Sequence, residues 1–249
     1  MLKLGHTIVR LEQAASTNSL VLASEAYVDR HGLVVVARRQ TAGRGRMGRT
    51  WHDLPGDQLF ASIVAHPRMA AAETPVVALI AGLALAQAIQ ETAGLDVRLK
   101  WPNDALIRGR KAAGILVESS PGRNGAPRLV IGIGVNCQGG PGDIPPELRQ
   151  RITTLSLEAG RPVGPQAVLQ ALLPRLDALL ERLVAGERAA LLGEWAQAAR
   201  VSGRWVLLPG AAVPAHGIVQ GISPEGHLVV EDVAGVRHRV VSGEVTWRD

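Results

Sequence analysis

The chain is poor in cysteine and in metal-binding patterns. Cys137 is the single cysteine among 249 residues, so no disulfide bond can form within the chain. A lone cysteine is expected to be a small buried hydrophobe, and its isolation fits a reducing cytoplasm. Cys-x-x-Cys, His-x-x-x-His and His-Glu-x-x-His spacings are missing. The sequence therefore predicts no zinc site held by the protein.

Long apolar runs are also missing. The longest uncharged segment of interest, residues 74–90, has 17 residues and contains polar ones, whereas a membrane span needs roughly 20 apolar residues. We predict a buried helix that begins at Pro75 and ends near Gly94. The N-terminus lacks the apolar core of a secretory signal, since polar residues interrupt it by Arg10. We expect a cytoplasmic protein with no membrane partner.

Lysine is scarce although the chain is basic. Of 27 basic residues only three are lysines, namely Lys3, Lys100 and Lys111, so arginine is the usual cation. A lysine inside the distinctive segment Lys100-Trp101-Pro102-Asn103-Asp104 suggests a role for a compact ammonium group. Apolar residues alternate over 97–101, which places Lys100 on the side away from the core. That side is either a wet surface or the face of a site.

The segment Gly43-Arg44-Gly45-Arg46-Met47-Gly48-Arg49-Thr50-Trp51 joins fixed positive charge to backbone that a phosphate can approach closely. It also contains G-x-G-x-x-G, which marks a dinucleotide site only between a strand and a helix. Here residues 38–42 separate the candidate strand 34–37 from the first glycine, and residues 51–57 disfavour a helix. No Walker A sequence occurs. We therefore interpret the segment as an anion-binding loop.

The remaining pattern predicts an α+β protein with a mixed sheet and flanking helices. Expected strands lie at 34–37, 59–65, 97–101, 105–107, 114–118 and 129–136, the fourth and fifth forming a hairpin. Expected helices lie at 20–29, 147–159, 165–185 and 187–199, and Pro174 is expected to kink or split the third. After Gly203 short β-type runs alternate with glycine and proline. This change predicts two domains, 1–200 and 201–249, with the smaller one packed on the larger.

Residues 43–51, which we call the arginine-glycine loop, and residues 100–104 together resemble two motifs of the biotin protein ligase family. Further segments of the same family pattern are Gly-Ile-Leu-x-Glu at 114–118, Gly-x-Gly-x-Asn at 132–136 and Ser242-Gly243-Glu244-Val245, so the resemblance runs from Ser16 to Val245. It implies a catalytic domain like those of class II aminoacyl-tRNA synthetases and biotin ligases, followed by an SH3-like barrel. It further implies that ATP and biotin form biotinyl-5'-AMP, with Mg²⁺ arriving on the nucleotide. Biotin then passes to a lysine of the biotin carboxyl carrier protein of acetyl-CoA carboxylase.

The resemblance also implies the site residues. Those expected to bind biotin are Ser16, Thr17, Asn18, Gln40, Gly43, Arg44, Gly45, Arg46, Lys100, Gly114, Ile115 and Gly134. Those expected to bind ATP are Arg46, Arg49, Trp51, Lys100, Asn103 and Asn136. Because carboxylate and phosphate repel each other, Lys100 and Arg46, together with Arg44, are expected to stabilise the charge at phosphorus. Whether Gly132 and Gly134 contact ligand or only pack stays open, and no general base for the lysine transfer is evident.

Two alternatives remain. A lipoate or octanoate ligase or transferase of related fold would lack the arginine-glycine loop. A non-catalytic nucleic-acid-binding module would suit the net charge of +5, but the arginines are dispersed and aromatic residues make up only 3%. Only 15 residues precede Ser16, too few for a helix-turn-helix, so we expect a monofunctional enzyme without specific DNA binding. A homodimer is compatible with the sequence.

Overall fold

A computed structural model describes residues 3–67, 73–121, 127–209 and 215–247. Its larger sheet has seven strands in the order β1-β2-β3-β7-β6-β5-β4. These strands are β1 (Thr7–Ala14), β2 (Leu33–Gln40), β3 (Leu59–Ala65), β4 (Arg98–Lys100), β5 (Asp104–Ile107), β6 (Arg110–Pro121) and β7 (Pro127–Val135). Only β1 and β2 pair in parallel; the other neighbours are antiparallel. The predicted hairpin is formed by β5 and β6.

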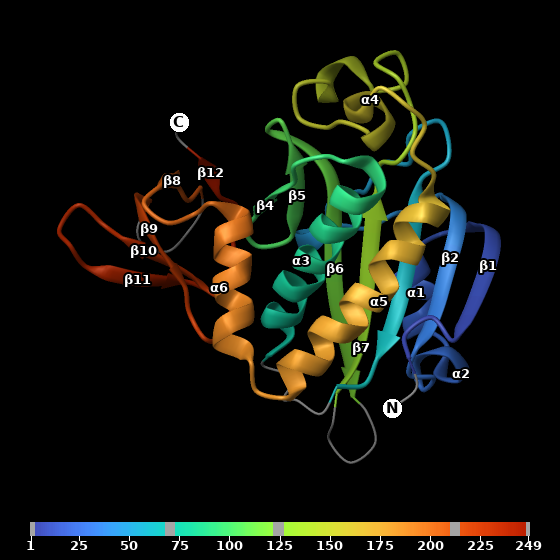
Figure 1. Ribbon diagram of the computed structural model, residues 1–249, viewed down its shortest axis with the longest axis horizontal. Coiled ribbons are helices and arrows are strands. Elements are labelled where there is room, and N and C mark those ends of the chain that lie inside the picture. Colours follow the sequence, from blue (N-terminus) through green and yellow to red (C-terminus); the bar gives the residue numbers. More distant parts are fainter. Residues whose placement is uncertain (1–2, 68–72, 122–126, 210–214, 248–249) are drawn as a thin grey trace.

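The sheet has helices on both faces (Figure 1). One face packs on α3 (Thr74–Ala93) and α5 (Pro165–Val184), and this side holds the main hydrophobic core. The other face carries α1 (Thr17–Leu22) and α2 (Glu25–Val28) over a smaller cluster that includes Leu33, Val35 and Val130. Successive side chains of a strand point to opposite faces of the sheet. Val34 therefore packs in the main core, whereas its neighbours Leu33 and Val35 pack in the smaller cluster on the other face.

The uncharged segment forms a core helix, as predicted. Pro75 lies in the first turn of α3, and Gly94 ends the helix with φ of 70°, a conformation that glycine adopts without strain. By length and composition α3 could cross a membrane, but 72% of its most apolar window is buried inside the protein. Its hydrophobicity therefore serves the core.

The predicted helix at 20–29 is two short helices. Ser16 caps α1 through its hydroxyl, which accepts a hydrogen bond from the Ser19 N–H. Ser24 then adopts extended backbone, with φ of −116° and ψ of 108°, and α2 starts afresh at Glu25. The long-helix prediction was wrong because it extended one helix across this extended residue.

The predicted helix at 147–159 was also too long. It is reduced to a 3₁₀ turn, η4 (Pro146–Leu148), and α4 (Leu155–Ala159). The intervening chain pairs with β6 instead: the Lys111 N–H donates to the Arg151 carbonyl, and the Thr153 N–H donates to the Lys111 carbonyl. Thr154 then caps α4 through its side chain. A distant strand thus competes with the local helical tendency.

Helix α5 passes through Pro174 without splitting, contrary to one of the two expected outcomes. Proline leaves the carbonyl of Gln170, four residues earlier, without its helical donor. Gln170 lies on the exposed side of the helix, where water can satisfy that carbonyl. The buried side, which includes Leu172 and Leu176, keeps its packing. The helix α6 (Arg188–Ala199) follows close to its predicted position.

The C-terminal part is a five-stranded antiparallel sheet in the order β11-β10-β9-β8-β12, consistent with an SH3-like fold. The strands are β8 (Trp205–Leu207), β9 (His216–Ile222), β10 (Leu228–Glu231), β11 (Arg237–Val240) and β12 (Thr246–Trp247). The sequence pattern did not reveal β12, which has two residues. The small sheet docks on the large part: Trp101 donates its Nε1–H to the Gly226 carbonyl at 3.0 Å.

Candidate functional site

A cavity of about 820 Å³ opens on the α1 face of the large sheet, beyond the end that α1 and α2 cover. One row of cross-strand neighbours crosses this face and lines the cavity. In register order the row is Phe60, Gly134, Gly114, Asp104 and Lys100. Because cross-strand neighbours point to the same side of a sheet, the register itself carries Lys100 into the cavity, on the side away from the buried Leu99 and Trp101.

Glycine forms the floor of the cavity. A Cβ at Gly134 would lie 2.8 Å from Trp51 Cε2, and one at Gly114 would lie 2.7 Å from Trp51 Cζ3. The indole therefore packs directly against two strands, and any larger residue would displace it. A Cβ at Gly132 would instead lie 2.5 Å from Asn18 Oδ1. In this structure Gly134 and Gly132 both make room for protein side chains.

The polar end of the cavity is built from α1 and β2. Gln40 Oε1 accepts hydrogen bonds from the Thr17 N–H at 2.8 Å and from the Thr17 hydroxyl at 3.2 Å. This leaves the Gln40 amide NH₂ as the donor group, and the residue lines the cavity with Ser16, Thr17 and Asn18. Ser62 Oγ, beneath them on β3, lies 2.8 Å from Thr17 Oγ1. Ser16, Thr17 and Asn18, which we call the Ser-Thr-Asn edge, are thus brought together with Gln40, as predicted for residues of one site.

The arginine-glycine loop folds as a tight hairpin over the cavity. The Gly45 N–H donates to the Arg49 carbonyl at 2.7 Å, and the Trp51 N–H donates to the Gly43 carbonyl at 2.9 Å. A dinucleotide-binding turn needs a helix directly after the strand. Here β2 is followed by only a three-residue 3₁₀ turn, η1 (Arg46–Gly48), which agrees with the interpretation of this segment as a different kind of loop. Gly43 does not line the cavity. It closes the base of the hairpin, where a Cβ would lie 2.8 Å from the Trp51 carbonyl oxygen.

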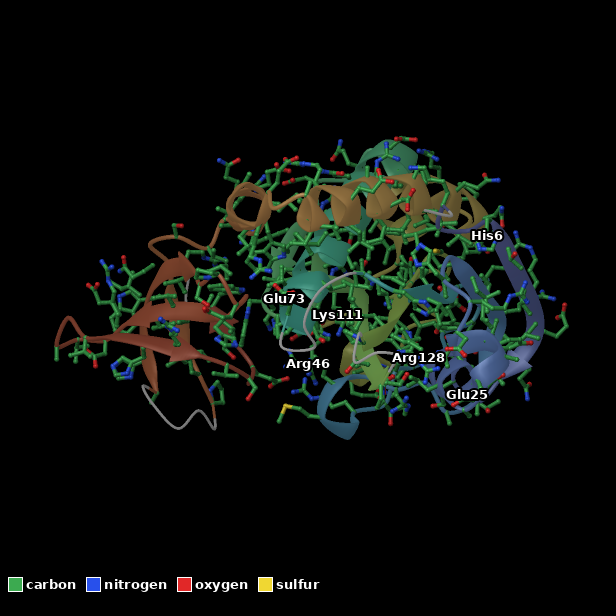
Figure 2. All side chains as sticks on the ribbon, turned by 90° about the horizontal axis from the view of Figure 1, so that it is seen from below. His6, Glu25, Arg46, Glu73, Lys111 and Arg128 are labelled. Atoms are coloured by element: carbon green, nitrogen blue, oxygen red, sulfur yellow. The ribbon has the colours of Figure 1, made fainter. Side chains whose placement is uncertain are left out.

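The cations around the cavity differ in their partners. Within the described residues, the side chain of Lys100 has no hydrogen bond or ion pair. Arg46 also lines the cavity; burial lowers the pKa of its guanidinium below the usual value, Asp104 raises it, and Arg49 lowers it. Arg44, by contrast, is paired with Glu118. Figure 2 shows Arg46 between the C-terminal sheet and the large sheet.

Lys111 is a cavity residue that sequence reasoning missed. Its Nζ lies 2.5 Å from Asp104 Oδ1 and 5.1 Å from the centre of the Trp51 ring. Like Arg46, it lines the cavity, and Figure 2 labels both residues. Its rarity as one of three lysines was a usable signal, but its place in a predicted hairpin turn concealed it. Arg151 also lines the cavity, and nothing in its surrounding sequence distinguished it.

Several predicted nucleotide residues have structural partners here. Asn103 donates from Nδ2 to the Ile115 carbonyl at 2.7 Å, and Asn136 donates from Nδ2 to the Thr153 carbonyl at 3.1 Å. Both line the cavity and brace its walls. Arg49 forms an ion pair with Glu244 and so connects the hairpin to the C-terminal part. All the predicted site residues except Gly43 line the one cavity.

The cavity offers little to a resident metal ion. Across the described ranges there is no group of three or more His, Cys, Asp or Glu side chains placed to hold one. Among the described residues, the two carboxylates that line the cavity are Asp104, which is paired with Lys111, and Glu244, which is paired with Arg49. The donor set therefore suits anions and neutral polar groups better than a bare cation.

Comparison with known proteins identifies the family. Residues 12–136 match the biotin/lipoate A/B protein ligase family, and residues 201–247 match the biotin protein ligase C-terminal domain. The chain belongs to the biotin/lipoate A/B protein ligase family. It is 36% identical to a biotin–[acetyl-CoA-carboxylase] ligase of Paracoccus denitrificans over 216 residues, which cover 85% of this chain and 88% of that protein.

A second sequence relative and a solved structure also resemble this chain. The bifunctional ligase/repressor BirA of Bacillus subtilis is 42% identical over 142 residues, which span 57% of this chain but only 44% of that longer protein. The structure resembles a biotin protein ligase from Aquifex aeolicus solved in complex with biotin and ATP. That match has a TM-score of 0.78 and 26% identity, and it covers 98% of this chain and 99% of the other. The expected fold, mixed sheet and small C-terminal domain together, is confirmed.

Proposed function

We propose that this protein is an ATP-dependent biotin protein ligase that forms biotinyl-5'-AMP and transfers biotin to a lysine of a biotin carboxyl carrier protein. The observation that carries the proposal is the cavity itself. It combines a polar end at Thr17 and Gln40, a floor of glycine and aromatic surface, and two cations, Lys100 and Arg46, that form no ion pair within the described residues. Membership of the biotin/lipoate A/B protein ligase family narrows the candidate ligands to acids such as biotin and lipoate, and the cavity has the polarity that biotin needs.

Biotin fits this polarity. Its neutral ureido group would take the Gln40 NH₂ and the hydroxyl groups of Ser16 and Thr17, since these offer both donors and acceptors. The apolar bicyclic ring and valeryl chain would lie along the sheet beside Phe60 and the edge of the Trp51 indole that covers the glycine floor. The carboxylate would then reach toward Lys100. Trp51 would form a wall for the adenine, with Arg49, Asn103 and Asn136 around the nucleotide.

In the first step the biotin carboxylate attacks the α-phosphorus of ATP and pyrophosphate leaves. Both reactants are anions, so fixed positive charge must offset their repulsion and the charge that develops at phosphorus. We assign Lys100 and Arg46 to this role because both line the cavity and, within the described residues, neither forms an ion pair, although Asp104 is a charge near Arg46. Mg²⁺ bound to the triphosphate would supply further positive charge, held by the nucleotide rather than by a cluster of protein carboxylates.

In the second step the amine of the carrier lysine attacks the acyl carbon and AMP leaves. The mixed anhydride is already activated, so holding the amine against it supplies much of the rate enhancement. No side chain is assigned as the base. The hairpin at 43–51 would cover the anhydride and slow its hydrolysis.

Exchange of labelled pyrophosphate into ATP tests the proposal. We expect exchange by the purified protein to depend on biotin, to be absent with lipoate or octanoate, and to be unaffected by DNA. Addition of a biotin carboxyl carrier domain should yield one biotinylated lysine. Exchange driven by lipoate instead would place the protein in the other branch of its family, and no exchange with any of these acids would refute the proposed activity.

A further inference from the structure

Glu118, on β6, lies outside the cavity lining but holds two elements that form it. Both of its carboxylate oxygens lie 3.0 Å from Nη2 of Arg44, in the arginine-glycine loop. The Glu118 side chain is 25% exposed, and that of Arg44 is 43% exposed. A partly buried, charge-assisted contact of this kind fixes a long side chain more firmly than a fully exposed ion pair does.

The same carboxylate also holds α1. Asn18 donates from Nδ2 to Glu118 Oε2 at 2.8 Å and to the Leu116 carbonyl at 3.1 Å. On its other side, Asn18 Oδ1 lies 2.5 Å from Ser62 Oγ. The lack of a side chain at Gly132 leaves room for this amide. A continuous set of contacts therefore runs from Arg44 through Glu118 and Asn18 to β3.

We propose that Glu118 is a positioning residue that sets the arginine-glycine loop and the Ser-Thr-Asn edge in a fixed relation before biotin binds. This rests on the proposed function, because the two elements it joins are those assigned to biotin. Glu118 touches neither reactant. It acts through Arg44 and Asn18.

The pairing has two physical consequences. Without Glu118, the loop would keep its hairpin bonds, the packing of Trp51 and the Arg49–Glu244 ion pair, but Arg44 would lose its contact with β6, and binding would have to supply the ordering of that part of the loop. The freed guanidinium of Arg44 would also add a mobile charge near Arg46. Because Lys100 and Arg46 stay in place, the loss should appear in KM for biotin rather than in kcat.

The test uses Glu118→Gln, which keeps an acceptor for Asn18 but removes the charge that binds Arg44. We expect the KM for biotin in pyrophosphate exchange to rise about tenfold while kcat stays within about threefold of wild type. Glu118→Asp, which restores the charge, should recover at least half of the loss on a logarithmic scale. The control is Glu194→Gln, which breaks the Arg182–Glu194 ion pair between α5 and α6, away from the cavity; its KM should not change.

Two further measurements separate positioning from a general structural effect. In a double-mutant cycle, Glu118→Gln should add less than about twofold to the KM of an Arg44→Met variant, because its effect passes through that arginine. Trypsin should cut the loop at Arg46 or Arg49 at least about threefold faster in Glu118→Gln than in wild type or Glu194→Gln. An unchanged KM, additive effects in the cycle, or unchanged cleavage would each overturn the proposal.

The proteolysis measurement needs no biotin chemistry. If wild-type protein showed no biotin-dependent exchange, the proposed function would fail, and the tether would then be decided by loop cleavage alone. Faster cleavage in Glu118→Gln would support it, and equal cleavage would overturn it.

Discussion

The two faces of β7 show how one sheet serves both stability and chemistry. Toward α3 the strand presents Ile131 and Val135, which are fully buried in the main core. Toward the cavity it presents Gly132 and Gly134, which give their space to Asn18 and Trp51. The first face stabilises the fold by apolar burial, whereas the second gives up that burial and leaves space that the Asn18 amide and the Trp51 indole occupy beside the cavity. Changes on the two faces should therefore separate activity from stability.

The largest effect is expected at Lys100. Lys100→Ala should lower biotin-dependent pyrophosphate exchange at least a hundredfold, about 3 kcal/mol, because it removes a preorganised charge at the transition state. The melting temperature should stay near that of wild type, since the side chain faces the cavity. Arg98→Ala on the same strand removes a charge outside the cavity lining and should leave exchange nearly unchanged. Normal exchange by a folded Lys100→Ala protein would remove Lys100 from the site.

Arg46→Gly should damage retention of the intermediate more than its formation. In the proposed function its guanidinium would hold the acyl-phosphate beneath the hairpin, and glycine would also loosen the loop. We expect the variant to make biotinyl-5'-AMP and release it, so that an unrelated bystander protein becomes labelled about tenfold more than with wild type. A blot for biotin on the bystander measures this. Wild-type labelling, with the adenylate still produced, would show that Arg46 does not retain it.

Gly134→Ala and Ile131→Ala form a matched pair across β7. The added methyl at Gly134 would press on Trp51, so exchange should fall about tenfold while the unfolding free energy falls by only about 1 kcal/mol, the lower end of the usual cost of overpacking. Ile131→Ala leaves a cavity in the core and should cost about 2–5 kcal/mol in unfolding free energy with little change in kcat/KM. Urea unfolding and exchange assays on both variants check this separation. The reverse pattern would mean that the two faces do not divide the roles.

The smallest effect is expected at Cys137. Burial raises the pKa of this thiol to about 12, so on the order of 1 in 10,000 molecules would carry a thiolate at pH 8. We expect native protein to resist iodoacetamide at pH 8 and to retain full exchange activity. Urea-unfolded protein, in which the pKa returns to its ordinary value, should react readily. Rapid labelling of the native protein would show that the thiol is accessible.

The sequence predicted those features that depend on local pattern. Alternation over 97–101 placed Lys100 correctly, and the uncharged run with Pro75 and Gly94 gave α3 almost to the residue. The features that the sequence did not predict depend on contacts between residues that are far apart along the chain. Glu118 pairs with Arg44, which lies 74 positions away in the sequence. Residues 151–153 are not helical as predicted, because Arg151 and Thr153 form backbone hydrogen bonds with Lys111 instead. Gly43 was assigned to biotin by its motif, whereas its place at the hairpin base follows from a contact with Trp51.

The most direct test is an experimental structure of the protein with a non-hydrolysable analogue of biotinyl-5'-AMP. The account predicts that the biotin ring lies in the cavity beside Phe60 and Trp51, with its ureido group at Thr17 and Gln40. The linking group should lie within hydrogen-bonding distance of Lys100 and Arg46. An analogue bound outside this cavity, or bound in it with Lys100 and Arg46 turned away from the linking group, would contradict the account.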